Sequence, residues 1–172
     1  MKKKYLLLIP LFLLLLTGCV KDTRKTIVLE DENLKLKTTF YYEEGENYTD
    51  FEEETGGASK EISFENEDLD LEFDMYYNNM RVATYEASKK SRSSQKFYKE
   101  YKFGEYDAYQ YGNYESGLYL NIVLNKEGEA LDVLFVSLER KDSNPEIVVS
   151  DVVAGKEVQK FFNSIKFEKL KK

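Results

Sequence analysis

Apolar and polar residues alternate along much of the chain, and this pattern predicts a domain built mainly from antiparallel strands. The clearest alternation runs from Leu69 to Met75, where every second residue is apolar and the residues between are acidic. Successive side chains of a strand point to opposite faces, so this segment would carry one apolar and one acidic face. Similar patterns predict strands at 34–42, 62–64, 97–103, 106–111, 118–124, 130–140 and 165–170, and they allow a short strand at 26–29.

Turn-forming residues separate the later strands and indicate an antiparallel meander. Gly112-Asn113 and the sequence Asn125-Lys126-Glu127-Gly128 are typical of turns between paired strands. Within the strand that follows, Leu131, Val133 and Phe135 would share one face because they are two residues apart.

Two segments have the pattern of helices. Residues 84–94 contain no glycine or proline and predict a short helix. Farther on, Pro145 suits a first helical position, and apolar residues at helical spacing predict a helix over 151–163. Gly155 would weaken the middle of this helix by up to about 1 kcal/mol relative to alanine.

The N-terminus has the arrangement of an export signal that ends in a cysteine. Three lysines at 2–4 precede an apolar run over 5–16, which is too short to cross a bilayer that needs roughly 20 apolar residues. Leu16-Thr17-Gly18-Cys19 then resembles the lipobox of bacterial lipoproteins. In that motif the cysteine thiol receives a diacylglyceryl group, and the signal is cleaved just before the cysteine. The alternative is an ordinary secretory signal followed by a chance cysteine.

The lipobox resemblance implies a division of the chain and a location. Residues 1–18 would be the signal peptide, 19–32 a lipidated N-terminus and tether, and 33–172 a single α+β domain. We therefore expect a lipoprotein anchored through lipid on Cys19 to the extracytoplasmic face of the cell membrane, by acyl chains worth roughly 0.8 kcal/mol for each buried CH₂.

The composition of the chain then limits which reactions and partners the domain is expected to have. The chain contains no histidine, and Cys19 is its only cysteine. Histidine is the commonest general base and zinc ligand, so we expect no enzymatic activity, no metal and no cofactor. The net charge of −7 becomes −10 once the three lysines of the signal are removed. An acidic domain argues against nucleic acid and anionic lipid as partners.

Two sequence stretches carry a resemblance to a known family. Residues 158–167 read Val-Gln-Lys-Phe-Phe-Asn-Ser-Ile-Lys-Phe, and 109–122 run from Tyr-Gln-Tyr to Leu-Asn-Ile. The order of elements over 34–170 and these stretches are similar to the PsbP/Mog1-like family. This resemblance implies an α-β-α sandwich, with a central antiparallel sheet of about six strands flanked by helices. The family includes photosystem subunits, nuclear-transport factors and bacterial lipoproteins, and it shares no catalytic motif, so no site residue follows.

Acidic residues form two clusters. The first cluster consists of Asp68, Asp70, Glu72 and Asp74. On a strand these four acids would line one face, about 7 Å apart, and could hold Ca²⁺. A solvated sheet face is the simpler interpretation. Residues 43–60 are polar and contain glycine, so we interpret them as a flexible acidic loop. Its acids are Glu43, Glu44, Glu46, Asp50, Glu52, Glu53 and Glu54.

Tyrosines are concentrated in the predicted meander. Exposed on one face they would form a recognition surface for a protein or for sugars, whereas under a helix they would be core residues with hydroxyls at the rim. They are Tyr98, Tyr101, Tyr106, Tyr109, Tyr111, Tyr114 and Tyr119.

These observations lead to one main functional hypothesis. We expect a non-enzymatic binding module whose tyrosine-rich face contacts another envelope or secreted protein. The alternative is a small-ligand or cell-wall-binding accessory lipoprotein of a transporter. A carboxylate-based hydrolase is a third hypothesis, since any acid-rich domain contains carboxylate pairs, but no pair is singled out by its spacing.

Overall fold

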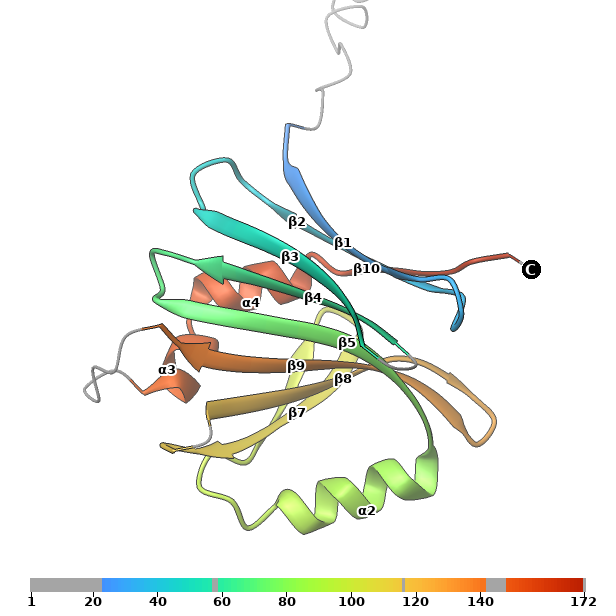
Figure 1. Cartoon of the computed structure of the whole chain (residues 1–172). Helices are drawn as coiled ribbons and strands as arrows, with labels where there is room; N and C mark the ends of the chain where they lie inside the picture. The colour runs from blue at the N-terminus through green and yellow to red at the C-terminus, as the bar shows by residue number, and fades with distance from the viewer. Residues whose placement is uncertain (1–22, 57–58, 116, 142–147, 172) are drawn as a thin grey trace, which may run out of the picture.

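Two antiparallel sheets and three helices make up the computed structural model, which describes residues 23–56, 59–115, 117–141 and 148–171 (Figure 1). The smaller sheet has the order β1-β2-β10 and consists of β1 (Lys25–Asp31), β2 (Leu36–Tyr42) and β10 (Lys166–Lys169). The larger sheet consists, in spatial order, of β3 (Tyr48–Gly56), β4 (Ser59–Asn66), β5 (Leu71–Arg81), β9 (Ala130–Arg140), β8 (Gly117–Glu127), β7 (Tyr106–Asn113) and β6 (Lys99–Phe103).

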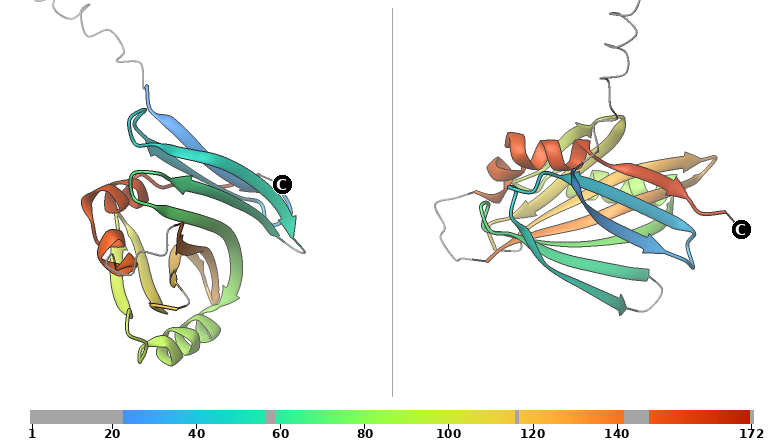
Figure 2. Two further views of the ribbon diagram at one scale, coloured as in Figure 1. Left: turned by 60° about the vertical axis from the view of Figure 1, so that its left-hand side comes forward. Right: turned by 90° about the horizontal axis from the view of Figure 1, so that it is seen from above.

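Different elements pack against the two faces of the seven-stranded sheet. One face packs against the smaller sheet and against α3 (Val149–Val153) and α4 (Lys156–Asn163), whereas α2 (Val82–Arg92) covers part of the other face. In Figure 1 and in the left view of Figure 2, the smaller sheet lies at the top of the molecule and α2 at the bottom. We call the second face the α2 face.

The main core lies between the two sheets and is rich in aromatic rings. Phe161 of α4 stacks on Phe40 of β2, with ring centroids 4.7 Å apart, and on Tyr48 of β3, at 4.8 Å. Tyr77 of β5 also joins the sheets, because its hydroxyl donates to the backbone oxygen of Leu29, 2.8 Å away. Burial raises the pKa of Tyr77 above its usual value, so this donor stays protonated.

The predicted α-β-α sandwich is wrong. Strands rather than helices dominate the described residues, and a three-stranded sheet occupies the place of one expected helical layer. The physical reason is the pairing of β2, which bonds β1 on one side and β10 on the other rather than joining the larger sheet. The fold that the PsbP/Mog1-like resemblance implied is therefore not that of this chain.

The predicted acidic loop at 43–60 is also wrong over most of its length, because it contains β3 and the start of β4. A register shift between Thr49 and Glu52 breaks the alternation that would have revealed the strand, and Asp50 has a positive φ of 51°. Tyr48 is buried in the core, while the acids of β3 lie along an outer strand.

The C-terminal helix divides at Gly155. The predicted helix over 151–163 is instead the pair α3 and α4, and Gly155 is the N-cap of α4. A Cβ atom at this position would lie 2.9 Å from the backbone oxygen of Val152, so a larger residue would collide there. Glycine thus ends the first helix rather than merely weakening a single one. Pro145 lies outside the described residues.

Other predicted elements are confirmed. The helix at 84–94 is α2, and the strand at 130–140 is β9 with the same bounds. The short strand allowed at 26–29 is β1, which buries Ile27 and Leu29. Part of the predicted tether is therefore built into the smaller sheet.

Candidate functional site: an aromatic row on the α2 face

Five aromatic rings form a continuous row across four neighbouring strands of the larger sheet. Successive ring centroids are separated by 4.8, 6.0, 5.2 and 5.9 Å. We call this set the aromatic row; from β5 through β9 and β8 to β7 it consists of Tyr76, Phe135, Tyr119, Tyr111 and Tyr109.

Strand register explains why these rings meet. Tyr76 is paired directly with Phe135, and Tyr111 with Tyr119. Each ring lies between two buried residues of its strand, whose side chains point to the opposite face; Tyr76, for example, lies between the buried Met75 and Tyr77. Aromatic pairs on one face of neighbouring strands stabilise a sheet, by roughly 0.2–1 kcal/mol for each pair.

The row is buried at one end and accessible at the other. Tyr109 is only 1% exposed because α2 covers it, and Tyr85 of α2 meets it edge to face at 5.3 Å. The guanidinium of Arg92 lies 4.7 Å from the centroid of Tyr111. Tyr119 and Tyr76, by contrast, are only partly buried. The accessible part therefore lies over β5, β9 and β8.

Carboxylates border the accessible end. Asp74 accepts hydrogen bonds from the hydroxyls of Ser63, at 2.7 Å, and Ser137, at 3.0 Å. Glu61 is paired in register with Tyr76. Burial raises the pKa of the Glu61 carboxyl, and repulsion from Asp74 adds to the shift. The row thus combines flat apolar rings with an acidic border.

The predicted acidic strand does not form a single line of four carboxylates. β5 begins at Leu71, so only Glu72 and Asp74 belong to it. Asp68 accepts a hydrogen bond from Asn47, and Asp70 pairs with Arg140 at 3.2 Å. Among the residues whose positions are described, no three acids gather in an arrangement that could hold a metal ion.

Acids of the segment 43–54 also lie apart from one another. Asp50, Glu52, Glu53 and Glu54 belong to β3, an outer strand of the larger sheet. Glu43 and Glu44 are exposed in the β2–β3 connection, while Glu46 pairs with Lys160 at 2.7 Å. Charged side chains on an outer strand oppose pairing with another chain.

The seven predicted tyrosines divide between the two faces. Tyr98, Tyr109, Tyr111 and Tyr119 contact the α2-face cluster, Tyr101 and Tyr106 pack against the main core, and Tyr114 is exposed in the β7–β8 connection. The interpretation as core residues under a helix holds for Tyr109, which α2 covers, whereas a recognition surface stays a prediction. Sequence reasoning missed Tyr76 and did not assign Phe135 to the site, because the β5–β9 register brings them into the row.

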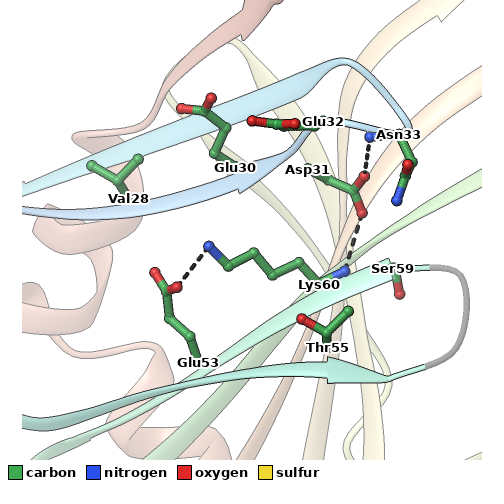
Figure 3. A pocket seen from close by; sticks show the side chains of 9 residues that line it. All are labelled: Val28, Glu30, Asp31, Glu32, Asn33, Glu53, Thr55, Ser59 and Lys60. Carbon is green, nitrogen blue, oxygen red and sulfur yellow. Dashed lines mark hydrogen bonds and ion pairs between the residues drawn. The ribbon is translucent and has the colours of Figure 1, made fainter.

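Two pockets lie away from the aromatic row. The first lies between β1 and the β3–β4 hairpin and has a volume of about 530 Å³ (Figure 3). There Asp31 accepts backbone hydrogen bonds from Asn33, Leu34 and Lys60, and the Lys60 ammonium pairs with Glu53 at 2.7 Å. These contacts hold the β1–β2 turn against β4, which is a structural role.

The second pocket, about 500 Å³ in volume, lies between the end of β2 and α4. We call it the Tyr41 pocket; its lining consists of Arg24, Tyr41, Tyr42, Glu43, Lys156, Gln159, Lys160, Asn163 and Ser164.

Comparisons of the chain with known protein families, with curated proteins and with solved structures found no match. Within the described residues, none of the helices has the length and apolar character needed to cross a membrane. Cys19 lies outside the described residues, so the predicted lipid attachment stays a prediction.

Proposed function

We propose that this protein is a lipoprotein, anchored through Cys19 to the extracytoplasmic face of the cell membrane, that binds another envelope or secreted protein without catalysing a reaction. The aromatic row is the contact surface. The observation that carries this proposal is a continuous line of rings whose accessible end, at Tyr76, Phe135 and Tyr119, has an acidic border.

Tyrosine rings on strands are well suited to recognition. They offer large apolar area, and they lose little side-chain entropy on binding because few torsions remain free. Here the neighbouring rings and the sheet backbone already hold each ring in place, which lowers the ordering cost further. Because the row extends over several strands, it suits an extended or flat partner.

The acidic border of the aromatic row indicates which charges a partner surface would carry. Glu61, Glu72 and Asp74 lie on the same face as Tyr76. A partner surface with apolar or aromatic groups flanked by lysine or arginine would complement both features. Opposite charges at the rim chiefly increase the association rate, and they make binding weaken as salt concentration rises.

The alternative is an accessory lipoprotein that binds a small ligand or the cell wall. Exposed ring faces can stack on sugars, so the same row would serve such a ligand. The two pockets described above do not include any ring of the row in their linings. Because the row extends over four neighbouring strands, we favour the protein partner.

A crosslinking pull-down from intact cells tests the proposal. The double variant Tyr76→Ser/Tyr119→Ser should lose most of the partner recovered with the wild type, since each ring of a binding hot spot contributes about 2 kcal/mol or more. The matched control is Phe51→Ser, which removes a ring that is 45% exposed and stacks on Phe64 of the main core. Equal recovery by the wild type and the double variant would contradict the assignment of the row.

A further inference from the structure

Asn121 of β8 lies within the aromatic row, although it is a polar residue. The strand register pairs it with Tyr109 of β7 and with Phe135 of β9. It follows Tyr119 by two residues, so its side chain points to the α2 face, as the rings of the row do. The side chain of Asn121 is only 5% exposed. An amide group is therefore buried among the rings of the candidate site.

The amide nitrogen of Asn121, Nδ2, has no hydrogen-bond partner. It is one of four such buried side-chain atoms in the described part of the chain, and the other three belong to residues that are not paired with a ring of the row. Burial raises the pKa of Tyr111, and Arg92 and the Asn121 amide partly offset this rise, so the amide lies toward the Tyr111 hydroxyl. The two groups do not meet with hydrogen-bond geometry, and the donor stays unpaired.

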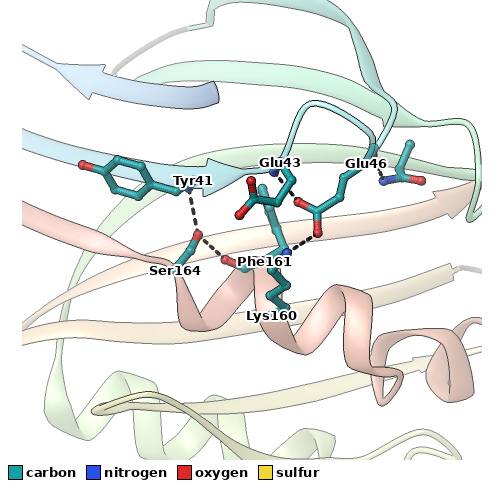
Figure 4. Close-up of polar contacts among 7 residues, drawn as sticks. Tyr41, Glu43, Glu46, Lys160, Phe161 and Ser164 are labelled. Atoms are coloured by element: carbon teal, nitrogen blue, oxygen red, sulfur yellow. Dashed lines mark hydrogen bonds and ion pairs between the residues drawn. The ribbon is translucent and has the colours of Figure 1, made fainter. Parts of the chain in front are cut away.

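Two polar side chains elsewhere in the fold show the contrast. Nδ2 of the buried Asn66 donates to the backbone oxygen of Glu46 over 2.9 Å. The hydroxyl of Ser164 accepts from the backbone N–H of Tyr41 over 2.8 Å and donates to the backbone oxygen of Phe161 over 2.6 Å (Figure 4). These bonds stabilise the fold, whereas an unpaired donor in the row destabilises it, because burial removes the hydrogen bonds that the donor makes to water.

The unpaired amide is next to the accessible end of the row. Tyr109, on one side of it, is covered by α2, whereas Tyr119 and Phe135 are only partly buried. Partly exposed side chains change rotamer quickly, so a turn of the Tyr119 ring would open Nδ2 of Asn121 to a partner. A leucine would fill nearly the same space without burying an unpaired donor. Asparagine at this position is therefore unfavourable for the fold and available for recognition.

The acidic border limits which acceptor can bind Nδ2. Glu61, Glu72 and Asp74 lie on the same face, so a carboxylate or a phosphate group would be repelled. A neutral oxygen avoids this repulsion, and every residue of a polypeptide backbone carries a carbonyl oxygen. Lysine or arginine side chains of the same segment would meet the border.

We propose that Asn121 determines the specificity of the aromatic row, and that its Nδ2 donates to a backbone carbonyl oxygen of an extended, basic segment of the partner protein. This inference rests on the proposed function and deepens it, because it defines the segment that the row recognises. An apolar side chain of that segment lies on the rings of Tyr119 and Phe135, and the bond to Asn121 satisfies the donor that is unpaired in the free protein.

The substitution Asn121→Leu separates recognition from folding. The partner is defined in the crosslinking pull-down as the protein that the wild type recovers and that Tyr76→Ser/Tyr119→Ser loses. We expect Asn121→Leu to recover about tenfold less of it, because the carbonyl oxygen of the partner is left unpaired. The midpoint of urea unfolding should equal or exceed that of the wild type. Recovery equal to the wild type would overturn this inference and leave the proposed function standing. A lowered midpoint together with lost recovery would also overturn it, since Asn121 would then serve the fold.

Asn66→Leu is the matched control, because it removes a buried amide that is hydrogen-bonded and lies outside the row. Its unfolding midpoint should fall, while recovery of the partner by the folded protein is retained. A second measurement follows the NMR signals of the Asn121 side-chain NH₂ group in the wild type, which should shift downfield when the recovered partner is added. Unchanged signals would overturn the inference even if Asn121→Leu failed to fold. If Tyr76→Ser/Tyr119→Ser recovers as much protein as the wild type, the proposed function itself is wrong.

Discussion

Replacing Phe161 with alanine is expected to lower the free energy of unfolding by about 3–5 kcal/mol, because a large buried ring is removed and a cavity remains. Phe161 is only 2% exposed and lies at the centre of the main core. Its ring contacts rings from both sheets and from its own helix, with centroids 4.7–6.1 Å away; these belong to Phe40, Tyr48, Phe64, Phe73 and Phe162.

Urea unfolding of the wild type and Phe161→Ala measures this loss as a shift in the transition midpoint at a similar slope. Phe51→Ala is the matched control. Its ring is 45% exposed and stacks on Phe64, so we expect a loss of about 1 kcal/mol or less. If Phe161→Ala cost no more than Phe51→Ala, the packing of α4 between the two sheets would be contradicted.

Cys19→Ala is expected to remove the protein from the membrane fraction or to block cleavage of residues 1–18. The thiol of Cys19 is the only one in the chain that can receive a diacylglyceryl group. Each acyl CH₂ buried in the bilayer contributes roughly 0.8 kcal/mol, so the loss of the acyl chains changes attachment from stable to negligible.

Cell fractionation and the mass of the product measure this effect. Thr17→Ala is the matched control, because it keeps a small residue ahead of the cysteine and should remain anchored and processed. A Cys19→Ala protein that stayed in the membrane and was cleaved normally would contradict the prediction that residues 16–19 form a lipobox.

Local alternation predicts strands well in this chain, whereas strand pairing cannot be inferred from it. β9 and α2 follow directly from their sequence patterns. The separation of β2 into a second sheet depends on its pairing with β10, about 130 residues away along the chain. A period of two is the same in either sheet, so the pattern could not distinguish the observed fold from a helix-flanked single sheet.

Two local features of the chain account for the other wrong predictions. In β3, the register shift between Thr49 and Glu52 and the run of acids conceal a strand. At Gly155, the loss of helix propensity was expected, but the close approach of the Val152 oxygen was not, because it depends on the three-dimensional path of the chain.

The candidate site was predicted in part. Four of the seven tyrosines lie on the α2 face, and Leu131, Val133 and Phe135 share that face as their spacing predicted. Tyr76 joins the row only through its register with Phe135. The Tyr41 pocket could not have been predicted at all, since its cations come from opposite ends of the chain and the composition is acidic.

Site-specific photocrosslinking in intact cells tests most directly whether the aromatic row is the contact surface. A photoreactive phenylalanine analogue is placed at Tyr119 in the row and, as the control, at Phe51 outside it. The account predicts one or a few discrete protein adducts at position 119 and none of these at position 51. No protein adduct at position 119, or the same adducts at both positions, would contradict it.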